Sequence, residues 1–104
     1  MTPVPADALS DRELDALLHA RLGLEGDPPA YSSDLDALLS PGTVSILEAL
    51  GAYEVQVGWE RIGYFATVYG RMDRSGGIVG SAHGRPSAAR AAAEAVAQAA
   101  RRLR

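Results

Sequence analysis

Two histidines are the residues best suited to acid–base chemistry, because the pKa of an imidazole lies near neutrality. His19 falls among leucines at helical spacing, where we predict a surface position, and His83 falls at the end of a predicted strand. Ser81 lies two residues before His83, so the two side chains would share one face of that strand. No third orienting group or oxyanion motif accompanies them, and neither histidine has a second ligand at metal spacing. We therefore predict no catalytic residue, no metal ligand and no cofactor, and do not expect an enzyme.

The glycines of the C-terminal half do not form a phosphate-binding loop. No Gly-Lys-Ser/Thr sequence follows them, and no dinucleotide fingerprint opens the last predicted helix. We interpret them as turn and bulge glycines, and the clustered aspartates of the N-terminal half as charges at helix starts and on solvated faces.

Aromatic side chains give a candidate contact surface. Phe65 and Tyr69 alternate with small apolar residues along a predicted strand, so both rings lie on its second face, and Arg71 shares that face. If that face is covered, the rings belong to the core. If it is open, they form an apolar patch for a partner or a platform on which bases stack. Arg85 and Arg90, near the start of the last helix, are the other candidate contacts for a partner or nucleic acid.

The elements that position these residues begin with helices. Residues 10–13 (SDRE) form a capping box, and the leucines after them predict a helix over residues 11–22 that Gly23 ends. Asp34 starts a second short helix. Residues 40–42 (SPG) interrupt it, and a further helix follows up to Gly51. Residues 1–9 contain two prolines and no periodicity, so we predict a flexible arm there and a single domain over residues 10–104.

The hydrophobic period then changes from helical to alternating. We predict strands over residues 53–59, 64–72 and 78–82, joined by turns at 60–63 and 73–77. A helix rich in alanine, the best helix former, follows over residues 87–103. The middle strand is apolar on both faces, which is typical of a strand covered on both sides. We therefore predict an α+β fold in which N-terminal helices, a three-stranded antiparallel meander and a long C-terminal helix pack as an α/β/α sandwich.

Composition supports one ordinary globular domain. The chain has 104 residues, 47% of them hydrophobic and 22% charged, which argues against disorder. The chain contains no cysteine, so disulfides and thiolate metal sites are excluded and a reducing compartment is favoured. The N-terminus lacks the pattern of a signal peptide and no apolar run is long enough to span a bilayer. We expect a cytoplasmic protein without a membrane contact.

Charge is distributed unevenly along the chain. Residues 1–60 carry a net charge of −9 and residues 61–104 a net charge of +6, and every basic residue is an arginine. Such asymmetry is typical of a surface for nucleic acid or for an acidic partner. It also fits acidic helices that attract a basic sheet and helix within one fold or between subunits, which is the interpretation that we favour.

Four segments carry a family resemblance: residues 12–17 (RELDAL), 29–34 (PAYSSD), the hairpin 53–57 and 63–68 (YEVQV, GYFATV), and 84–91 (GRPSAARA). Together the region from Arg12 to Leu103 resembles the phage ABA sandwich domain, a family of small phage and prophage proteins of unknown function. The resemblance implies α/β/α layering and a phage-type origin, and no chemistry. The break at Ser40-Pro41-Gly42 departs from the family, in which the second helix runs on.

Two further folds share this element order. Double-stranded RNA-binding domains are similar from Gly77 to Ala93, but Ala88 and Ala89 stand where a phosphate clamp needs basic residues. HicB-type antitoxin domains resemble the chain from Tyr53 onward. We therefore expect a non-enzymatic protein-interaction domain that self-associates or binds an unknown protein partner. An RNA- or DNA-binding module that uses the arginine-rich C-terminal half and a HicB-like antitoxin are the alternatives.

Overall fold

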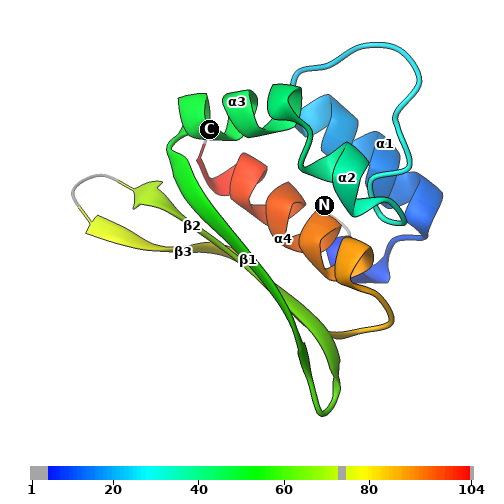
Figure 1. Cartoon of the computed structure of the whole chain (residues 1–104). Coiled ribbons are helices and arrows are strands. Elements are labelled where there is room, and N and C mark those ends of the chain that lie inside the picture. Colours follow the sequence, from blue (N-terminus) through cyan, green and yellow to red (C-terminus); the bar gives the residue numbers. More distant parts are fainter. Residues whose placement is uncertain (1–4, 73–74, 104) are drawn as a thin grey trace.

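The chain forms an α+β fold in a computed structural model that describes residues 5–72 and 75–103, with no account of the side chains of residues 72–76. The described elements follow in the order η1 (Ala6–Ala8), α1 (Asp11–Arg21), α2 (Leu35–Leu38), α3 (Pro41–Leu50), β1 (Ala52–Glu60), β2 (Gly63–Met72), β3 (Ser75–Arg85) and α4 (Ala88–Arg102). The predicted fold class, with N-terminal helices, a three-stranded antiparallel meander and a C-terminal helix, is confirmed (Figure 1).

Local sequence signals fix the ends of the helices. The Ser10 hydroxyl accepts a hydrogen bond from the Glu13 amide while the Glu13 carboxylate accepts one from the Ser10 amide, which completes the predicted capping box. The Ser40 hydroxyl caps α3, whose first residue is Pro41, so the predicted break between two short helices is confirmed. Gly51 ends α3 with φ at 110° and turns the chain directly into β1.

The sheet has the strand order β1-β2-β3, and its inner face supplies one side of the core. Val55 on β1 lies opposite Val68 on β2, which lies opposite Gly80 on β3. Ala66 and Val68 are fully buried on this face. The third strand is longer than the predicted 78–82, because its backbone pairs with β2 from Ser75 to Arg85 despite its glycines. Of the predicted 73–77 turn, residues 73 and 74 lie outside the described residues.

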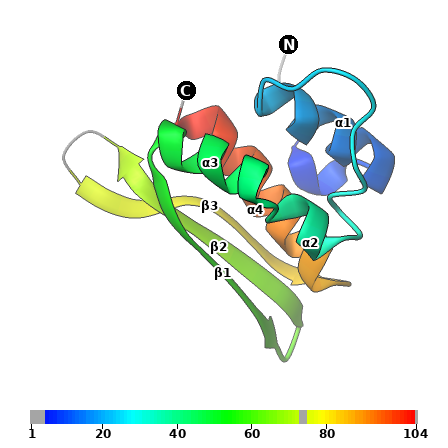
Figure 2. The same cartoon turned by 45° about the horizontal axis from the view of Figure 1, so that its top comes forward.

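The four described α-helices lie on one side of the sheet, so the predicted α/β/α layer order is wrong (Figures 1 and 2). α4 packs on the inner face of the sheet, mainly on β3 and β2, and α1 and α2 pack on α4 from the other side. The layers are therefore sheet, α4, and then α1 to α3. The apolar pattern on both faces of β2 indicated two covers, but the helices of the described residues cover only one face of the sheet.

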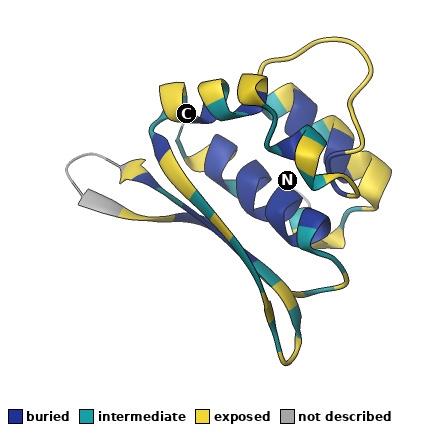
Figure 3. Cartoon of the chain, viewed as in Figure 1, coloured by how far each residue is buried: buried dark blue, intermediate teal, exposed yellow. Residues whose placement is uncertain are grey.

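The central place of α4 explains its composition. Nearly every residue from Ala89 to Ala100 is buried, as the dark blue of this helix in Figure 3 shows. Small side chains let two layers approach α4 closely. At Gly80 a Cβ atom would overlap the carbonyl oxygen of Ala95 and lie 3.0 Å from the amide nitrogen of Ala99, so only glycine fits there. The pair of Gly80 and the alanine surface of α4 therefore sets the distance between helix and sheet.

The second half of the predicted flexible arm is held on the fold. Residues 6–8 form η1, which contacts α4. The carbonyl oxygens of Ala6 and Leu9 accept hydrogen bonds from the Arg90 guanidinium at 3.2 and 2.6 Å. The anchor is a residue more than 80 positions away, which explains why periodicity in residues 1–9 gave no sign of it. Residues 1–4 lie outside the described residues.

We predict that Gly80→Ala lowers the free energy of unfolding by at least about 3 kcal/mol, because the new methyl group would force β3 away from α4. Gly77→Ala is the matched control, since a Cβ atom on Gly77 meets nothing within 4 Å. Urea unfolding followed by circular dichroism measures both variants. Equal effects of the two substitutions would contradict the close approach of α4.

Candidate functional site

The outer face of the sheet is the strongest candidate site in the described part of the chain, because it carries large apolar side chains and no helix covers it (Figures 1 and 2). We call it the open face. Phe65 and Tyr69 on β2 point to it because they alternate with the buried Ala66 and Val68. Ile78 on β3 lies opposite Tyr69 and is 55% exposed. The predicted alternative in which this face is open is therefore the one observed.

Phe65 forms the best-ordered part of the open face. Its ring lies over Gly58 on β1, where a Cβ atom would come within 2.6 Å of the ring. On the other side the ring stacks with His83 of β3, with centroids 5.9 Å apart and an interplanar angle of 15°. The His83 imidazole lies 3.7 Å from the Glu60 carboxylate. This row of side chains crosses all three strands and leaves Phe65 half-buried without any covering helix.

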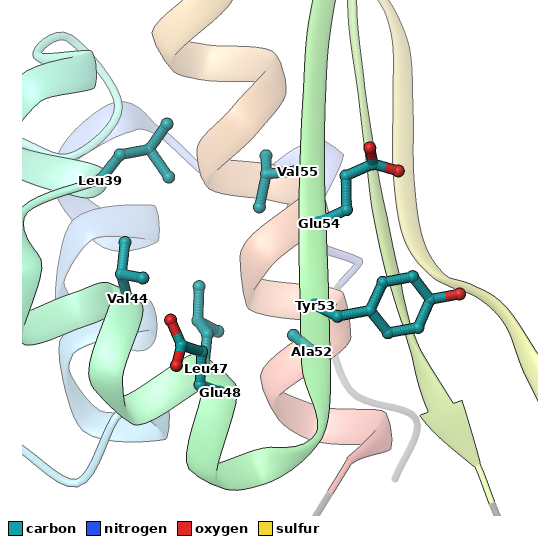
Figure 4. A pocket seen from close by; sticks show the side chains of 8 residues that line it. All are labelled: Leu39, Val44, Leu47, Glu48, Ala52, Tyr53, Glu54 and Val55. Atoms are coloured by element: carbon teal, nitrogen blue, oxygen red, sulfur yellow. The ribbon is translucent and has the colours of Figure 1, made fainter.

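Tyr53 and Trp59 extend the apolar surface of β1 in different directions. Tyr53 is 57% exposed and points over the open face, away from α3 (Figure 4). The strand pairing shifts register between Ala52 and Glu54, so the consecutive side chains of Tyr53 and Glu54 can both be exposed. Trp59 is 70% exposed near the β1–β2 turn and lies opposite Tyr64, on the inner side of the sheet. It is therefore separate from the open face.

Arg85 and Arg90 converge on a buried carboxylate. Glu94 has no exposed side-chain surface, and its two oxygens accept hydrogen bonds from Nε of Arg85 and Nε of Arg90, each at 2.7 Å. Arg90 also donates to Asp11 at 2.8 Å. We call these four residues the arginine cluster. It joins β3, α4 and the start of α1, so opposite charges of the two halves of the chain meet within one fold.

The cluster occupies the two arginines that were predicted to contact nucleic acid or a partner. Arg90 is 8% exposed, and Nε and both terminal nitrogens of its guanidinium donate to protein oxygens. Burial lowers the pKa of Arg90, but its hydrogen bonds with Glu94 and Asp11 and their charges outweigh burial, so the pKa lies above its usual value. Arg90 is a structural residue in this fold. The five predicted contact residues thus divide between the open face and this internal cluster.

His19 is buried, so its predicted surface position is wrong. Its Nε2 lies 3.0 Å from the Glu25 carbonyl oxygen, which can only accept, so Nε2 donates this bond, and Nδ1 shares a hydrogen bond of 2.8 Å with the Tyr31 hydroxyl. Asp15 accepts from the Ser32 amide at 2.8 Å nearby. These contacts fasten the loop after α1. The partners lie in a loop without a hydrophobic pattern, so spacing alone could not place them.

The described residues do not assemble a further chemical site around Ser81. The backbone N–H and C=O of Ser81 both bond to the side-chain amide of Gln98 on α4, at 3.2 and 2.9 Å, while His83 is occupied with Phe65 and Glu60. Among described residues, no group of three or more His, Cys, Asp or Glu is placed to hold a metal ion. None of the described helices combines the length and apolarity needed to cross a membrane.

Comparison of the chain with protein-family models, curated proteins and solved structures gave no significant match. The resemblances to the phage sandwich family, to double-stranded RNA-binding domains and to HicB-type antitoxins therefore stay predictions.

We predict that Glu94→Gln lowers the free energy of unfolding by about 3–5 kcal/mol, because two arginines then lose the charge that compensates their burial. The side chain of Asp11, the other acidic partner of Arg90, is 67% exposed. We therefore expect Asp11→Asn to lower the free energy of unfolding by at most about 1 kcal/mol. Urea unfolding at neutral pH compares the two variants. An effect of Glu94→Gln no larger than that of Asp11→Asn would contradict the arginine cluster as a structural anchor.

Stability should also fall at alkaline pH because of Tyr31. Burial, and then the charge of Asp15, raise the pKa of the Tyr31 hydroxyl above its ordinary value. The unfolded chain therefore releases this proton first, and stability is lost as pH rises above about 10, the value for an unperturbed tyrosine. Urea midpoints between about pH 8 and pH 11 should decline less steeply in Tyr31→Phe than in the wild type. Tyr53→Phe, on an exposed tyrosine, should keep the wild-type decline; identical slopes in all three proteins would contradict the assignment.

Proposed function

We propose that the chain is a non-enzymatic protein-interaction domain that self-associates through the open face of its sheet. The observation that carries the proposal is a cross-strand surface of Phe65, Tyr69 and Ile78 that none of the described helices covers. A strand that is apolar on both faces is usually covered on both sides. A second copy supplies the missing cover, and two such sheets packed face to face form a sandwich about 10 Å thick.

The charges of the open face favour a second copy over a strongly charged partner. Glu54 lies opposite Tyr69, and Arg71 follows Tyr69 by two residues on β2, so both charges lie on this face at the same end of the β1–β2 pair. A surface with both signs can complement itself when a two-fold axis brings the acid of one copy toward the base of the other. A face with one dominant sign would instead repel its own copy.

The same charges argue against the nucleic-acid alternative. Bases can stack on exposed aromatic rings, but phosphate binding needs several cations that are free to reach the backbone. Arg90 is buried and Arg85 is bonded to Glu94. On the open face, Arg71 is accompanied by Glu54 and Glu60. No observation favours the antitoxin alternative, and phage-type origin and cytoplasmic location stay predictions.

The size of the face predicts a weak dimer. Three strands of 9, 10 and 11 residues span about 30 Å by 14 Å at ordinary strand spacings. Face-to-face pairing would bury roughly 800–1,000 Å² in total, below the usual 1,200–2,000 Å² of a stable interface. We therefore expect a dissociation constant in the micromolar range, on the order of 10–100 µM.

Sedimentation velocity from about 1 µM to about 500 µM should show a shift from monomer to dimer. The double variant Tyr69→Thr with Ile78→Thr should stay monomeric, because it removes an apolar cross-strand pair while threonine keeps strand propensity. Circular dichroism checks that the variant is folded. The single variant Ile78→Thr, on a side chain that is already largely exposed, should weaken the dimer at least about threefold and serves if the double variant does not fold.

Ile62→Thr is the matched control, because Ile62 is 70% exposed in the turn between β1 and β2 and lies outside the open face. It should dimerise like the wild type. A wild-type chain that stays monomeric at the highest concentration, or a dimer that Ile62→Thr and Ile78→Thr weaken equally, would overturn the proposal. Binding of duplex or single-stranded RNA or DNA at low salt that Tyr69→Thr with Ile78→Thr abolishes would favour the nucleic-acid alternative instead.

A further inference from the structure

An apolar groove lies between α3 and the free side of β1, apart from the open face (Figure 4). It has a volume of about 200 Å³. Leu39, Val44 and Leu47 line it from the helical side, and Val55 points into it from β1. Leu39, Val44 and Val55 are only half-buried, so apolar surface remains accessible. The groove exists because α4 packs mainly on β3 and β2, while α3 makes few contacts with β1.

The two edges of the sheet differ in what their backbones contact. On β3, the side-chain amide of Gln98 bonds to both the N–H and the C=O of Ser81, near the middle of that edge. On β1, no backbone hydrogen bond among the described residues joins the side away from β2 to another segment. An open strand edge is a template for pairing with a further strand. The edge on which no described residue makes such a contact is therefore the one beside the apolar groove.

We propose that this groove binds an extended peptide segment of a partner protein, one with alternating apolar and basic residues, which adds to β1 as a fourth strand. In such a strand one set of side chains points inward, where Val44 and Val55 would receive apolar groups. The other set points to the outer side, next to Glu54 on β1. Strand addition beside a helix combines backbone hydrogen bonds, which give affinity, with pockets, which give specificity.

Charge selects a basic peptide over a second copy of this chain. β1 carries Glu54 and Glu60 and no basic residue, and Glu48 lines the groove from α3. Pairing β1 with β1 of a second copy would bring these carboxylates together, and like charges on adjacent strands are destabilising. A strand with arginine or lysine on its outer side would face carboxylates instead. The same carboxylates disfavour an acidic peptide.

The experiment uses a fluorescent peptide of about seven residues in which arginine and valine alternate. Fluorescence anisotropy with the whole chain at low salt should show saturable binding. A peptide that alternates glutamate and valine should bind at least about tenfold more weakly, as should an arginine–valine peptide with a central proline, which cannot donate to a ladder. In ¹⁵N spectra the amides of β1 and α3 should shift on binding, and those of Tyr69 and Ile78 should not.

Glu48→Lys should weaken the arginine–valine peptide about fivefold to tenfold, because it reverses a charge at the groove. Glu25→Lys is the matched control, on an exposed loop residue elsewhere, and should bind like the wild type. Absence of saturable binding, equal binding of the glutamate or proline peptide, or equal effects of the two lysine variants would overturn the proposal. Tyr69→Thr with Ile78→Thr should still bind the peptide, and Glu48→Lys should still dimerise, so this proposal and the proposed function can fail separately.

Discussion

The close packing of α4 against the sheet is the constraint on which the rest of the structure depends. Where Gly80 faces Ala95 and Ala99, no side chain separates the helix from the strand. The opposite side of α4 is also rich in alanine, which lets α1 and α2 pack closely there. A helix that is buried nearly all round can lie between two layers, so the N-terminal helices stack on α4 rather than on the far face of the sheet. Glu94 and Arg90 then supply the polar anchor that fixes η1 and α1 to this central helix.

Both candidate surfaces follow from that single stacking order. Because the helices share one side, the open face keeps its aromatic side chains exposed or half-exposed. Because α4 lies toward β3, the β1 edge is left beside α3 with a groove between them. The two surfaces differ in charge: the open face holds both signs, while the groove is flanked by carboxylates. One surface therefore fits a second copy, and the other fits a basic peptide.

Much of the fold could be predicted from local sequence signals, because those signals act over a few residues. The capping box at Ser10, the break at Pro41 and the alternation along β2 all describe short-range geometry, and each is confirmed. The layer order could not be predicted in the same way. The pattern on β2 shows that Phe65 and Tyr69 lie on a second face, but not what covers it. The partial burial of Phe65 comes instead from Gly58 and His83 on the same sheet.

In the candidate site, too, local patterns predicted some features and long-range packing decided the others. Phe65, Tyr69 and Arg71 were predicted to share a face, and the register of β2 places them there. Arg85 and Arg90 were predicted as possible contacts, yet they bind Glu94, whose burial depends on long-range packing of α4. The spacing of Arg90 and Glu94 by four residues on a helix was the one local signal for this pair. The groove combines Leu39, which follows α2, with residues of α3 and β1, and no single segment gave a signal for it.

Whether the open face is the self-association surface can be measured directly by recording ¹⁵N–¹H spectra of the labelled chain over a dilution series. We predict that the amide signals of Thr67, Tyr69, Ile78 and Ser81 shift with concentration, while those within α1 and α4 stay fixed. A spectrum that is unchanged on dilution would contradict it. Shifts confined to β1 and α3 would contradict it as well, because they would place self-association at the groove.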